Sequence, residues 1–191
     1  MNANTTDTLR LFFALWPDDT TRAALQQLQV TLQGRIIPYG NLHLTLAFLG
    51  QQPTTLVGIA KDILSHLSSP PISMTLDRMG YFARNRIAWV GTHQVPAELL
   101  ALHKELAEAL RQREITFDSQ QNFKPHITLA RDASPPPDTS FTPIAWHASR
   151  VALVQSVTNA EGARYQVVAS RSLDEKCWTP DERGLEGDAA Q

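Results

Sequence analysis

A His-x-Thr-Leu-Ala pattern occurs twice in this chain, each time within a short apolar run. His43 and Thr45 stand in residues 41–50, and His126 and Thr128 repeat the pattern much later. In an extended strand successive side chains point to opposite faces, so each histidine shares a face with its threonine. Each segment is therefore predicted to be a strand that buries one face in a core and presents an imidazole beside a hydroxyl on the other.

The rest of the chain reads as strands and helices arranged around these two segments. At 191 residues and 42% hydrophobic content, the chain is long enough to bury a proper core. Apolar spacing and turn residues predict strands at residues 9–16, 42–49, 72–77 (continuing towards Phe82), 87–91, 126–131, 151–156 and 165–169, and helices at residues 18–34, 54–67 and 96–110. This order predicts an α+β protein with mostly antiparallel pairing, and each His-x-Thr strand follows a helix, as in two similar lobes.

Composition excludes several classes of protein. A net charge of −2 argues against gripping long nucleic acids by charge, although recognition of one nucleotide or an RNA end is compatible with it. Cys177 is the only cysteine, so no intramolecular disulfide forms, and the apolar run 11–16 is too short to span a bilayer. We expect a cytoplasmic monomer without membrane partners, with one domain over residues 1–178 and an acidic, disordered tail over residues 179–191.

Paired histidines favour acid–base chemistry at phosphorus. An imidazole exchanges protons near neutral pH, so a neutral and a protonated histidine on opposite sides of one centre act as general base and general acid. The threonine hydroxyls are then suited to hold the non-bridging oxygens of a phosphate during in-line displacement. One His-x-Thr in a strand is usually structural, but two copies in matching contexts favour function. The remaining histidines, which lack this setting, are His66, His93, His103 and His147.

A metal site is the main chemical competitor. Two histidines with no aspartate, glutamate or cysteine in either motif form a poor first shell for zinc. We therefore expect no metal and no cofactor.

The repeated motif resembles the two-histidine (2H) phosphoesterases, most closely the bacterial RNA 2′,3′-cyclic phosphodiesterases once called 2′-5′ RNA ligases. The matching blocks are residues 10–15, 41–50 and 123–131, and the resemblance runs from about residue 9 to residue 173. It implies a bilobal, pseudo-symmetric α+β fold in which two mostly antiparallel sheets line a central cleft, with helices outside. It also implies metal-independent hydrolysis of 2′,3′-cyclic phosphates, at RNA ends or in nucleotides, to 2′-phosphomonoesters.

The resemblance also implies roles for the motif residues. His43 would donate a proton to the departing 3′-oxygen, His126 would accept a proton from water, and Thr45 and Thr128 would bind the phosphate oxygens. The two motifs are too alike for the residues themselves to decide which histidine is the acid, so that direction comes from the family.

Two neighbouring residues are further candidates for substrate binding. Phe48 lies five positions after His43, and Arg131 lies five positions after His126, so strict alternation places both on the opposite face from the histidines. The resemblance suggests that Phe48 stacks on a base. Arg131 is a candidate to contact phosphate or to stack on the base. The alternatives are a core phenylalanine and a solvated surface arginine.

The same residues leave other activities open. A 2′-5′ RNA ligase or a 2′,5′-phosphodiesterase would use the same groups on a different substrate. A non-catalytic module that binds nucleotides or RNA ends is the alternative from another class, although intact histidine and threonine at all four positions argue against it.

Overall fold

The computed structural model describes residues 7–118, 123–137, 140–159 and 162–174. The strands are β1 (Thr8–Leu15), β2 (Arg35–Ile36), β3 (Leu44–Pro53), β4 (Ile72–Leu76), β5 (Arg78–Phe82), β6 (Ile87–Gly91), β7 (His126–Arg131), β8 (Ile144–Ala148), β9 (Arg150–Asn159) and β10 (Gly162–Ser172). The helices are α1 (Asp19–Gln29), α2 (Leu56–His66) and α3 (Ala97–Gln112), with short 3₁₀ turns η1 (Tyr39–Asn41) and η2 (Ala83–Asn85). The predicted tail at 179–191 lies outside the described residues.

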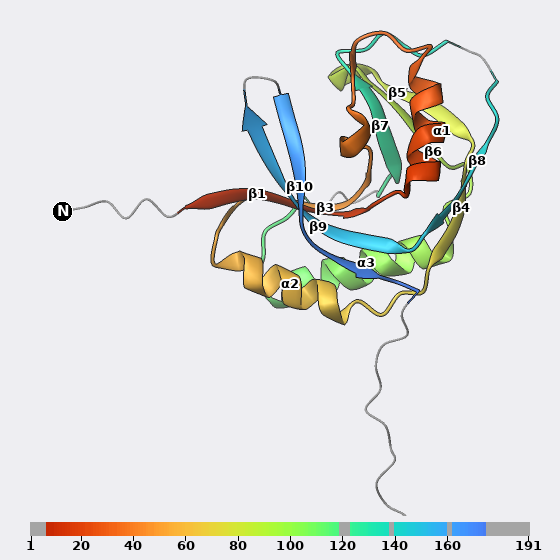
Figure 1. Ribbon diagram of the computed structural model, residues 1–191. Helices are drawn as coiled ribbons and strands as arrows, with labels where there is room; N and C mark the ends of the chain where they lie inside the picture. The colour runs from red at the N-terminus through yellow and green to blue at the C-terminus, as the bar shows by residue number, and fades with distance from the viewer. Residues whose placement is uncertain (1–6, 119–122, 138–139, 160–161, 175–191) are drawn as a thin grey trace, which may run out of the picture.

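One large antiparallel sheet forms the centre of the molecule (Figure 1). Its strands follow the order β10-β9-β1-β3-β7-β6-β5, and β2 pairs with β7. The two halves of this sheet meet at β3 and β7, which pair only through Leu44 and Ile127. The α+β class and the antiparallel pairing are thus confirmed, and the two expected sheets are joined at one residue pair, between the two His-x-Thr motifs.

The helices cover the outer side of this sheet. Helix α2 packs on β3, β9 and β10, α3 packs on β3 and α2, and α1 packs on β7 and β8 (Figure 1). One buried apolar cluster joins these elements, with members such as Phe13 on β1, Leu25 on α1, Ile63 on α2 and Leu102 on α3. The helices therefore occupy the face opposite to the one that carries the histidines.

The region after α2 differs from the prediction. The expected continuous strand from residue 72 towards Phe82 is wrong, because the chain changes sheet at Asp77. Strand β4 pairs with β8 in a separate two-stranded sheet, whereas β5 pairs with β6 in the large sheet. The chain bends where the Asp77 carboxylate accepts a hydrogen bond from the His93 backbone N–H, 2.9 Å away. Strand β2 was not predicted, since it has only two residues. The sequence around His147 is strand-like but is absent from the predicted order of elements; it forms β8, whose partner β4 is distant in the chain.

Both motif strands contain a β-bulge at the same place. In the pairing of β1 with β3, Ala14 lies opposite Thr45 and Phe13 lies opposite Ala47, so Leu46 is an extra residue. In the pairing of β6 with β7, Trp89 lies opposite Thr128 and Ala88 lies opposite Ala130. Leu129 is therefore the equivalent extra residue. A one-residue bulge reverses the alternation of the side chains that follow it, up to the next bulge, which in β3 is at Leu49, after Phe48.

Gly34 gives a prediction about stability. The sequence suggested that it ends the first helix, but α1 ends at Gln29, and Gly34 instead leads into β2 with a φ of +109°. A Cβ atom at Gly34 would lie 2.7 Å from the Arg131 carbonyl oxygen and 2.8 Å from the Ala133 Cα. Gly34→Ala is therefore expected to lower the free energy of unfolding by about 2 kcal/mol or more.

Chemical denaturation of Gly34→Ala beside Gly58→Ala measures this effect. Gly58 is exposed within α2, and a Cβ atom there meets no other atom within 4 Å. The second substitution is expected to stabilise the protein by about 0.5–1 kcal/mol, because alanine loses less conformational entropy in a helix. Equal effects of the two substitutions would contradict the proposed backbone contact.

Candidate active site

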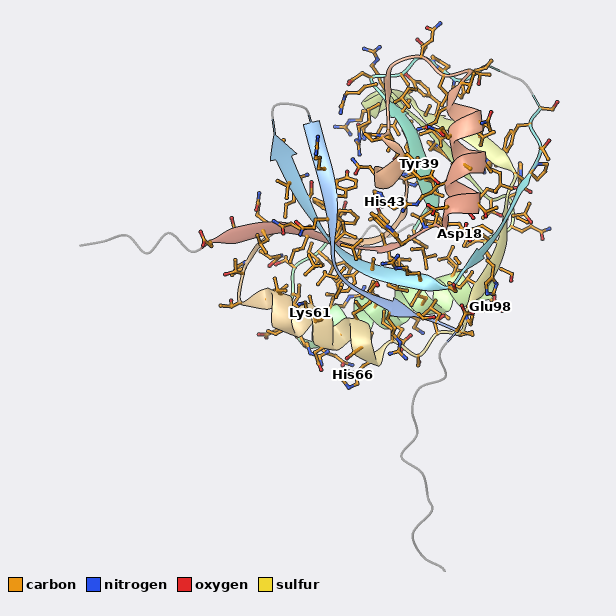
Figure 2. The ribbon with its side chains drawn as sticks, in the orientation of Figure 1. Asp18, Tyr39, His43, Lys61, His66 and Glu98 are labelled. Atoms are coloured by element: carbon orange, nitrogen blue, oxygen red, sulfur yellow. The ribbon has the colours of Figure 1, made fainter. Side chains whose placement is uncertain are left out.

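His43 lies at the entrance of β3, with both ring nitrogens bonded. Its Nδ1 lies 2.6 Å from the Asn41 carbonyl oxygen, and its Nε2 lies 3.1 Å from the Thr45 hydroxyl. A carbonyl oxygen only accepts, so Nδ1 carries the hydrogen and Nε2 is the unprotonated nitrogen. The Thr45 hydroxyl therefore donates to Nε2. The labels of His43 and Tyr39 in Figure 2 mark this region, where η1 leads into β3.

Asn41 fixes the position of His43, and the sequence reasoning did not identify it as a site residue. Its side-chain Nδ2 donates to the Ala163 carbonyl oxygen at 2.7 Å, and its Oδ1 accepts from the Tyr165 backbone N–H at 3.2 Å. These two bonds tie η1 to β10, while the Asn41 carbonyl orients the His43 ring. The only available signal was an asparagine two positions before the histidine.

His126 begins β7 and has an equivalent arrangement. Its Nδ1 lies 2.7 Å from the Lys124 carbonyl oxygen and therefore carries the hydrogen. Each histidine thus donates to the carbonyl of the residue two positions before it. Both rings have the same tautomer, with Nε2 left unprotonated and able to accept a proton.

Aromatic rings surround both imidazoles. The His43 ring centroid lies 4.8 Å from that of Phe12, 5.2 Å from that of Tyr165 and 6.0 Å from that of Trp16. The His126 ring lies 5.0 Å from Phe82 and 6.0 Å from Trp89. These contacts orient the imidazoles and remove water from their sides.

Removal of water controls the charge of both histidines. Burial lowers the pKa of His43 from 6.5 to about 4; the Asn41 carbonyl opposes this shift, and the charges of Arg131, His126 and Arg22 add to it. Burial also lowers the pKa of His126, again opposed by its carbonyl partner and supported by Arg131. Both imidazoles are therefore mainly neutral near neutral pH when no anion is bound.

The two motifs share one small cavity, which we call the inner cavity. It has a volume of about 130 Å³, and its walls include His43, Thr45, His126, Thr128 and Arg131. Five of the six predicted site residues thus converge on one small space.

The sixth predicted residue, Phe48, lines an adjoining space that we call the outer chamber. This chamber has a volume of about 340 Å³ and shares His43, Thr45 and Arg131 with the inner cavity. Phe48 and Arg131 therefore lie on the histidine face, which corrects the expectation from strict alternation. The reason is a bulge before each residue: the bulge at Leu46 reverses the alternation before Phe48, and the bulge at Leu129 reverses it before Arg131.

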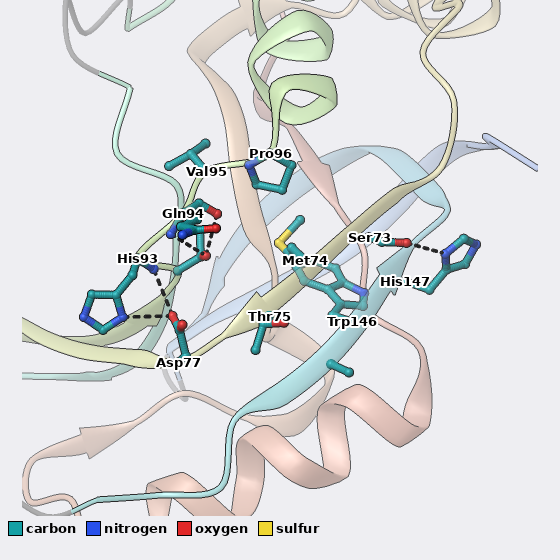
Figure 3. A pocket seen from close by; sticks show the side chains of 12 residues that line it. Ser73, Met74, Thr75, Asp77, His93, Gln94, Val95, Pro96, Trp146 and His147 are labelled. Carbon is teal, nitrogen blue, oxygen red and sulfur yellow. Dashed lines mark hydrogen bonds and ion pairs between the residues drawn. The ribbon is translucent and has the colours of Figure 1, made fainter.

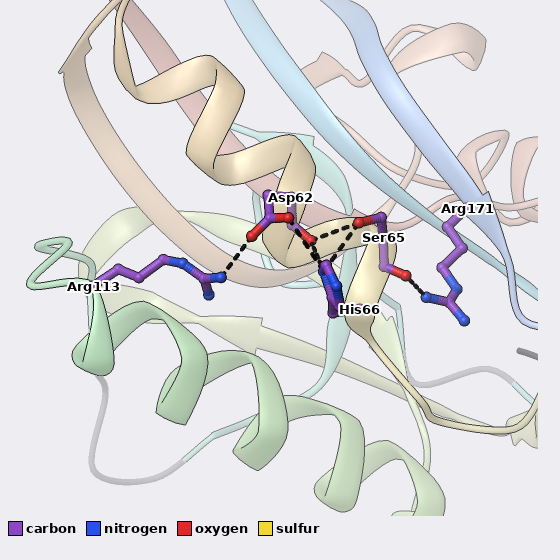
Figure 4. A network of polar contacts seen from close by, with 5 residues as sticks. All are labelled: Asp62, Ser65, His66, Arg113 and Arg171. Atoms are coloured by element: carbon purple, nitrogen blue, oxygen red, sulfur yellow. Dashed lines mark hydrogen bonds and ion pairs between the residues drawn. The ribbon is translucent and has the colours of Figure 1, made fainter. Parts of the chain in front are cut away.

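The other histidines lie outside these two spaces. His66 ends α2 on the outside of the molecule, within hydrogen-bond distance of Asp62 (Figure 4). His103 stacks on Phe123 with ring centroids 4.0 Å apart. His93 and His147 line a larger cavity of about 790 Å³ at the β4–β8 sheet, where His93 pairs with Asp77 (Figure 3). That cavity contains neither His-x-Thr motif.

Within residues 7–118, 123–137, 140–159 and 162–174, no group of three or more His, Cys, Asp or Glu side chains is placed to hold a metal ion. Within the same ranges, no helix has the length and apolar character needed to cross a membrane.

Comparison with known proteins gives consistent matches. The sequence model of the 2′-5′ RNA ligase superfamily matches residues 16–160. A relative from Escherichia coli (strain K12), named RNA 2′,3′-cyclic phosphodiesterase, is 36% identical over 145 residues, which cover 70% of this chain and 80% of the relative. A relative of the same name from Thermus thermophilus is 30% identical over 179 residues, which cover 86% of this chain and 90% of the relative.

Solved structures show the same fold. The crystal structure of E. coli LigT in its apo form aligns with a TM-score of 0.72 and 29% identity, covering 87% of this chain and 98% of that one. A structure described as a phosphoesterase aligns with a TM-score of 0.76 and 28% identity, covering 88% of this chain and all of that one. The bilobal fold expected from the sequence is therefore shared with these proteins.

Proposed function

Because the chain belongs to the 2′-5′ RNA ligase superfamily, we propose that it is an RNA 2′,3′-cyclic phosphodiesterase that opens cyclic phosphates to 2′-phosphomonoesters. Relatives at 36% and 30% identity have this name. The observation that carries the proposal is the inner cavity, where both histidines and both threonines meet around about 130 Å³. Its proposed substrates are RNA ends or cyclic nucleotides, and we expect a monomer that acts in the cytoplasm.

In this mechanism the two imidazoles act on opposite sides of one phosphorus. His126 takes a proton from water through its unprotonated Nε2, and the water oxygen forms the new bond to phosphorus. The bond from phosphorus to the 3′-oxygen breaks, and His43 supplies the proton that this oxygen needs. The phosphate remains on the 2′-oxygen. The two rings have the same tautomer and equivalent carbonyl partners, so their geometry does not distinguish the acid from the base. The assignment of His43 as acid and His126 as base therefore follows the family pattern.

The acid role requires His43 to gain a proton when substrate binds. Its pKa is about 4 in the empty site, partly because of Arg131. A phosphate anion beside the ring favours the charged imidazolium and offsets the charge of Arg131, so binding raises this pKa. The Thr45 hydroxyl, which donates to His43 Nε2 in the empty site, is then released to donate to a phosphate oxygen. Thr128 is suited to the same role from the other half.

Product analysis in excess chelator tests the proposal. The protein is incubated with a 2′,3′-cyclic nucleotide and EDTA, and the monoester isomers are separated by chromatography. We expect the 2′-monoester at an undiminished rate, because the acid, the base and the phosphate-binding groups are all side chains. A 3′-monoester product would show that the bond from phosphorus to the 2′-oxygen breaks instead. Activity that is lost in EDTA and restored only by adding a divalent metal would contradict the metal-free mechanism.

The 2′-5′ ligase alternative uses the same groups. A ribose 5′-hydroxyl in place of water would attack the same phosphorus and create a 2′-5′ linkage. Adding RNA with a free 5′-hydroxyl to the same assay detects this activity as a longer product.

A further inference from the structure

The outer chamber changes in character along its length. Near the histidine its wall is aromatic, because the rings of Phe12 and Tyr165 lie 4.8 and 5.2 Å from the His43 ring, and Phe48 adds a third aromatic ring to the wall. Further along β1 and β9, beyond Phe12 and Val154, the wall is polar, with Arg10, Ser156 and Thr158. The polar end is not needed for the acid–base step, because the groups assigned to that step line the inner cavity.

Strand register places these polar residues on the histidine face. On β9, alternate residues Ala152 and Val154 belong to the small apolar cluster beside Phe12 and Phe48. Ser156 and Thr158 continue the same alternation, and Arg10 lies opposite Ser156 in the pairing of β1 with β9. The sheet therefore presents one continuous surface from the histidine to the arginine.

The chamber carries more positive charge than a single phosphate requires. Arg131, Arg35 and Arg10 line it, and no carboxylate belongs to its described wall. Arg131 also lines the inner cavity, and we assign it to the reacting phosphate. Arg35 is paired with Asp132 at 3.3 Å, which compensates its charge.

Arg10 is the remaining cation of the chamber. Its guanidinium lies over the Phe48 ring, 4.9 Å from the centroid, and it forms no ion pair among residues 7–118, 123–137, 140–159 and 162–174. Stacking on the ring orients the guanidinium and leaves its N–H groups available, and a guanidinium fork matches two oxygens of a phosphate.

We infer that Arg10, with the hydroxyls of Ser156 and Thr158, binds a second phosphate, the phosphodiester on the 5′ side of the terminal nucleotide. This inference rests on the proposed function and names its substrate class. The enzyme prefers an RNA end with a nucleotide upstream of the cyclic phosphate over a free 2′,3′-cyclic nucleotide.

Kinetics on two matched substrates test this inference. The first is cytidine 2′,3′-cyclic phosphate, and the second is a dinucleotide that ends in the same cyclic cytidine. We expect kcat/KM to be at least about tenfold higher for the dinucleotide, and Arg10→Gln to lower that ratio by about tenfold, as for one charge-assisted hydrogen-bonded contact. Because kcat/KM for the dinucleotide is divided by kcat/KM for the mononucleotide, a general loss of activity in a variant cancels in the ratio.

Arg111→Gln is the matched control. Arg111 also lies over an aromatic ring, 5.6 Å from the Phe117 centroid, but on α3, on the outer side of the sheet. The Arg111→Gln variant should have the wild-type kcat/KM for both substrates. A wild-type ratio near one, or an unchanged ratio in Arg10→Gln, would overturn the inference while leaving the proposed hydrolysis intact.

A binding measurement decides the question even if neither substrate is hydrolysed. The affinity of the dinucleotide is measured over a range of salt concentrations for the wild type and for Arg10→Gln. Loss of one phosphate contact is expected to reduce the slope of log Kd against log salt by about 0.7. An equal slope would overturn the inference. Cytidine 5′-diphosphate is tested as a competitor. If it binds as tightly as the dinucleotide and its affinity falls equally in Arg10→Gln, the chamber is a general diphosphate site and the inference is overturned.

Discussion

Replacing either His43 or His126 by alanine is expected to lower kcat/KM for a 2′,3′-cyclic phosphate by roughly a thousandfold. Each imidazole is assigned one proton transfer, and neither has a substitute: the remaining walls of the inner cavity are hydroxyl, amide, aliphatic, phenol and guanidinium groups. The two losses should not multiply in the double variant, because acid and base act in one step. Steady-state kinetics with the same cyclic nucleotide for all three variants measure both effects.

Matched variants separate chemistry from folding. His43 packs against Phe12, Trp16 and Tyr165, so its replacement by alanine also removes packing. His43→Gln and His126→Gln keep much of the side-chain volume but cannot exchange protons, and they should be equally inactive while melting near the wild-type temperature. His66→Ala, on the outside of α2 (Figure 2), should keep full activity. Wild-type turnover in either His43 or His126 variant would contradict the assignment.

Arg131→Gln is expected to have the second largest effect, on both the rate and its pH dependence. The positive charge of Arg131 lowers the pKa of His43 and of His126, so its removal raises both pKa values. The bell-shaped profile of kcat/KM should therefore move to higher pH in the variant. Its maximum should also fall by roughly ten- to a hundredfold, because a charge-assisted contact to the phosphate is lost.

The wild-type profile gives the reference for this shift. Both histidine pKa values lie below 6.5, so the form with one protonated and one neutral ring is most populated on the acidic side of 6.5 in the free enzyme. The two limbs belong to the coupled pair rather than to one residue. Arg78→Gln removes a cation that lies near Trp89 but does not contribute to either shift, and its profile should match the wild type. A profile that rises steadily through the alkaline range would contradict a paired acid and base.

The pairing pattern shows why some of the fold was predictable and some was not. Helix α3 was predicted closely, because Leu99, Leu102, Leu106 and Leu110 recur at helical spacing and all four are buried. The split of the strand at Asp77 was not predicted, because alternation over residues 72–76 gives no information about which distant strand lies alongside. Only the pairing of β4 with β8 separates it from β5.

The candidate site divides in the same way. A repeated His-x-Thr segment is a local pattern, so the sequence by itself identified the two strands and the histidines and threonines on them, which we propose as the acid–base pair and the phosphate-binding hydroxyls. Phe48 and Arg131 were found only as candidates, and their faces were predicted wrongly. Residues Asn41 and Arg10 were missed, because their roles depend on contacts with β10 and β9.

Three properties were decided by the tertiary structure alone. A bulge arises where two paired strands differ by one residue, so the faces of Phe48 and Arg131 depend on the partner strands β1 and β6. The meeting of both motifs around one cavity depends on the pairing of Leu44 with Ile127. The lowered pKa values depend on burial by aromatic rings from several strands. Each is a relation between segments distant in the chain, whereas the residue types proposed for the chemistry follow from the two His-x-Thr segments themselves.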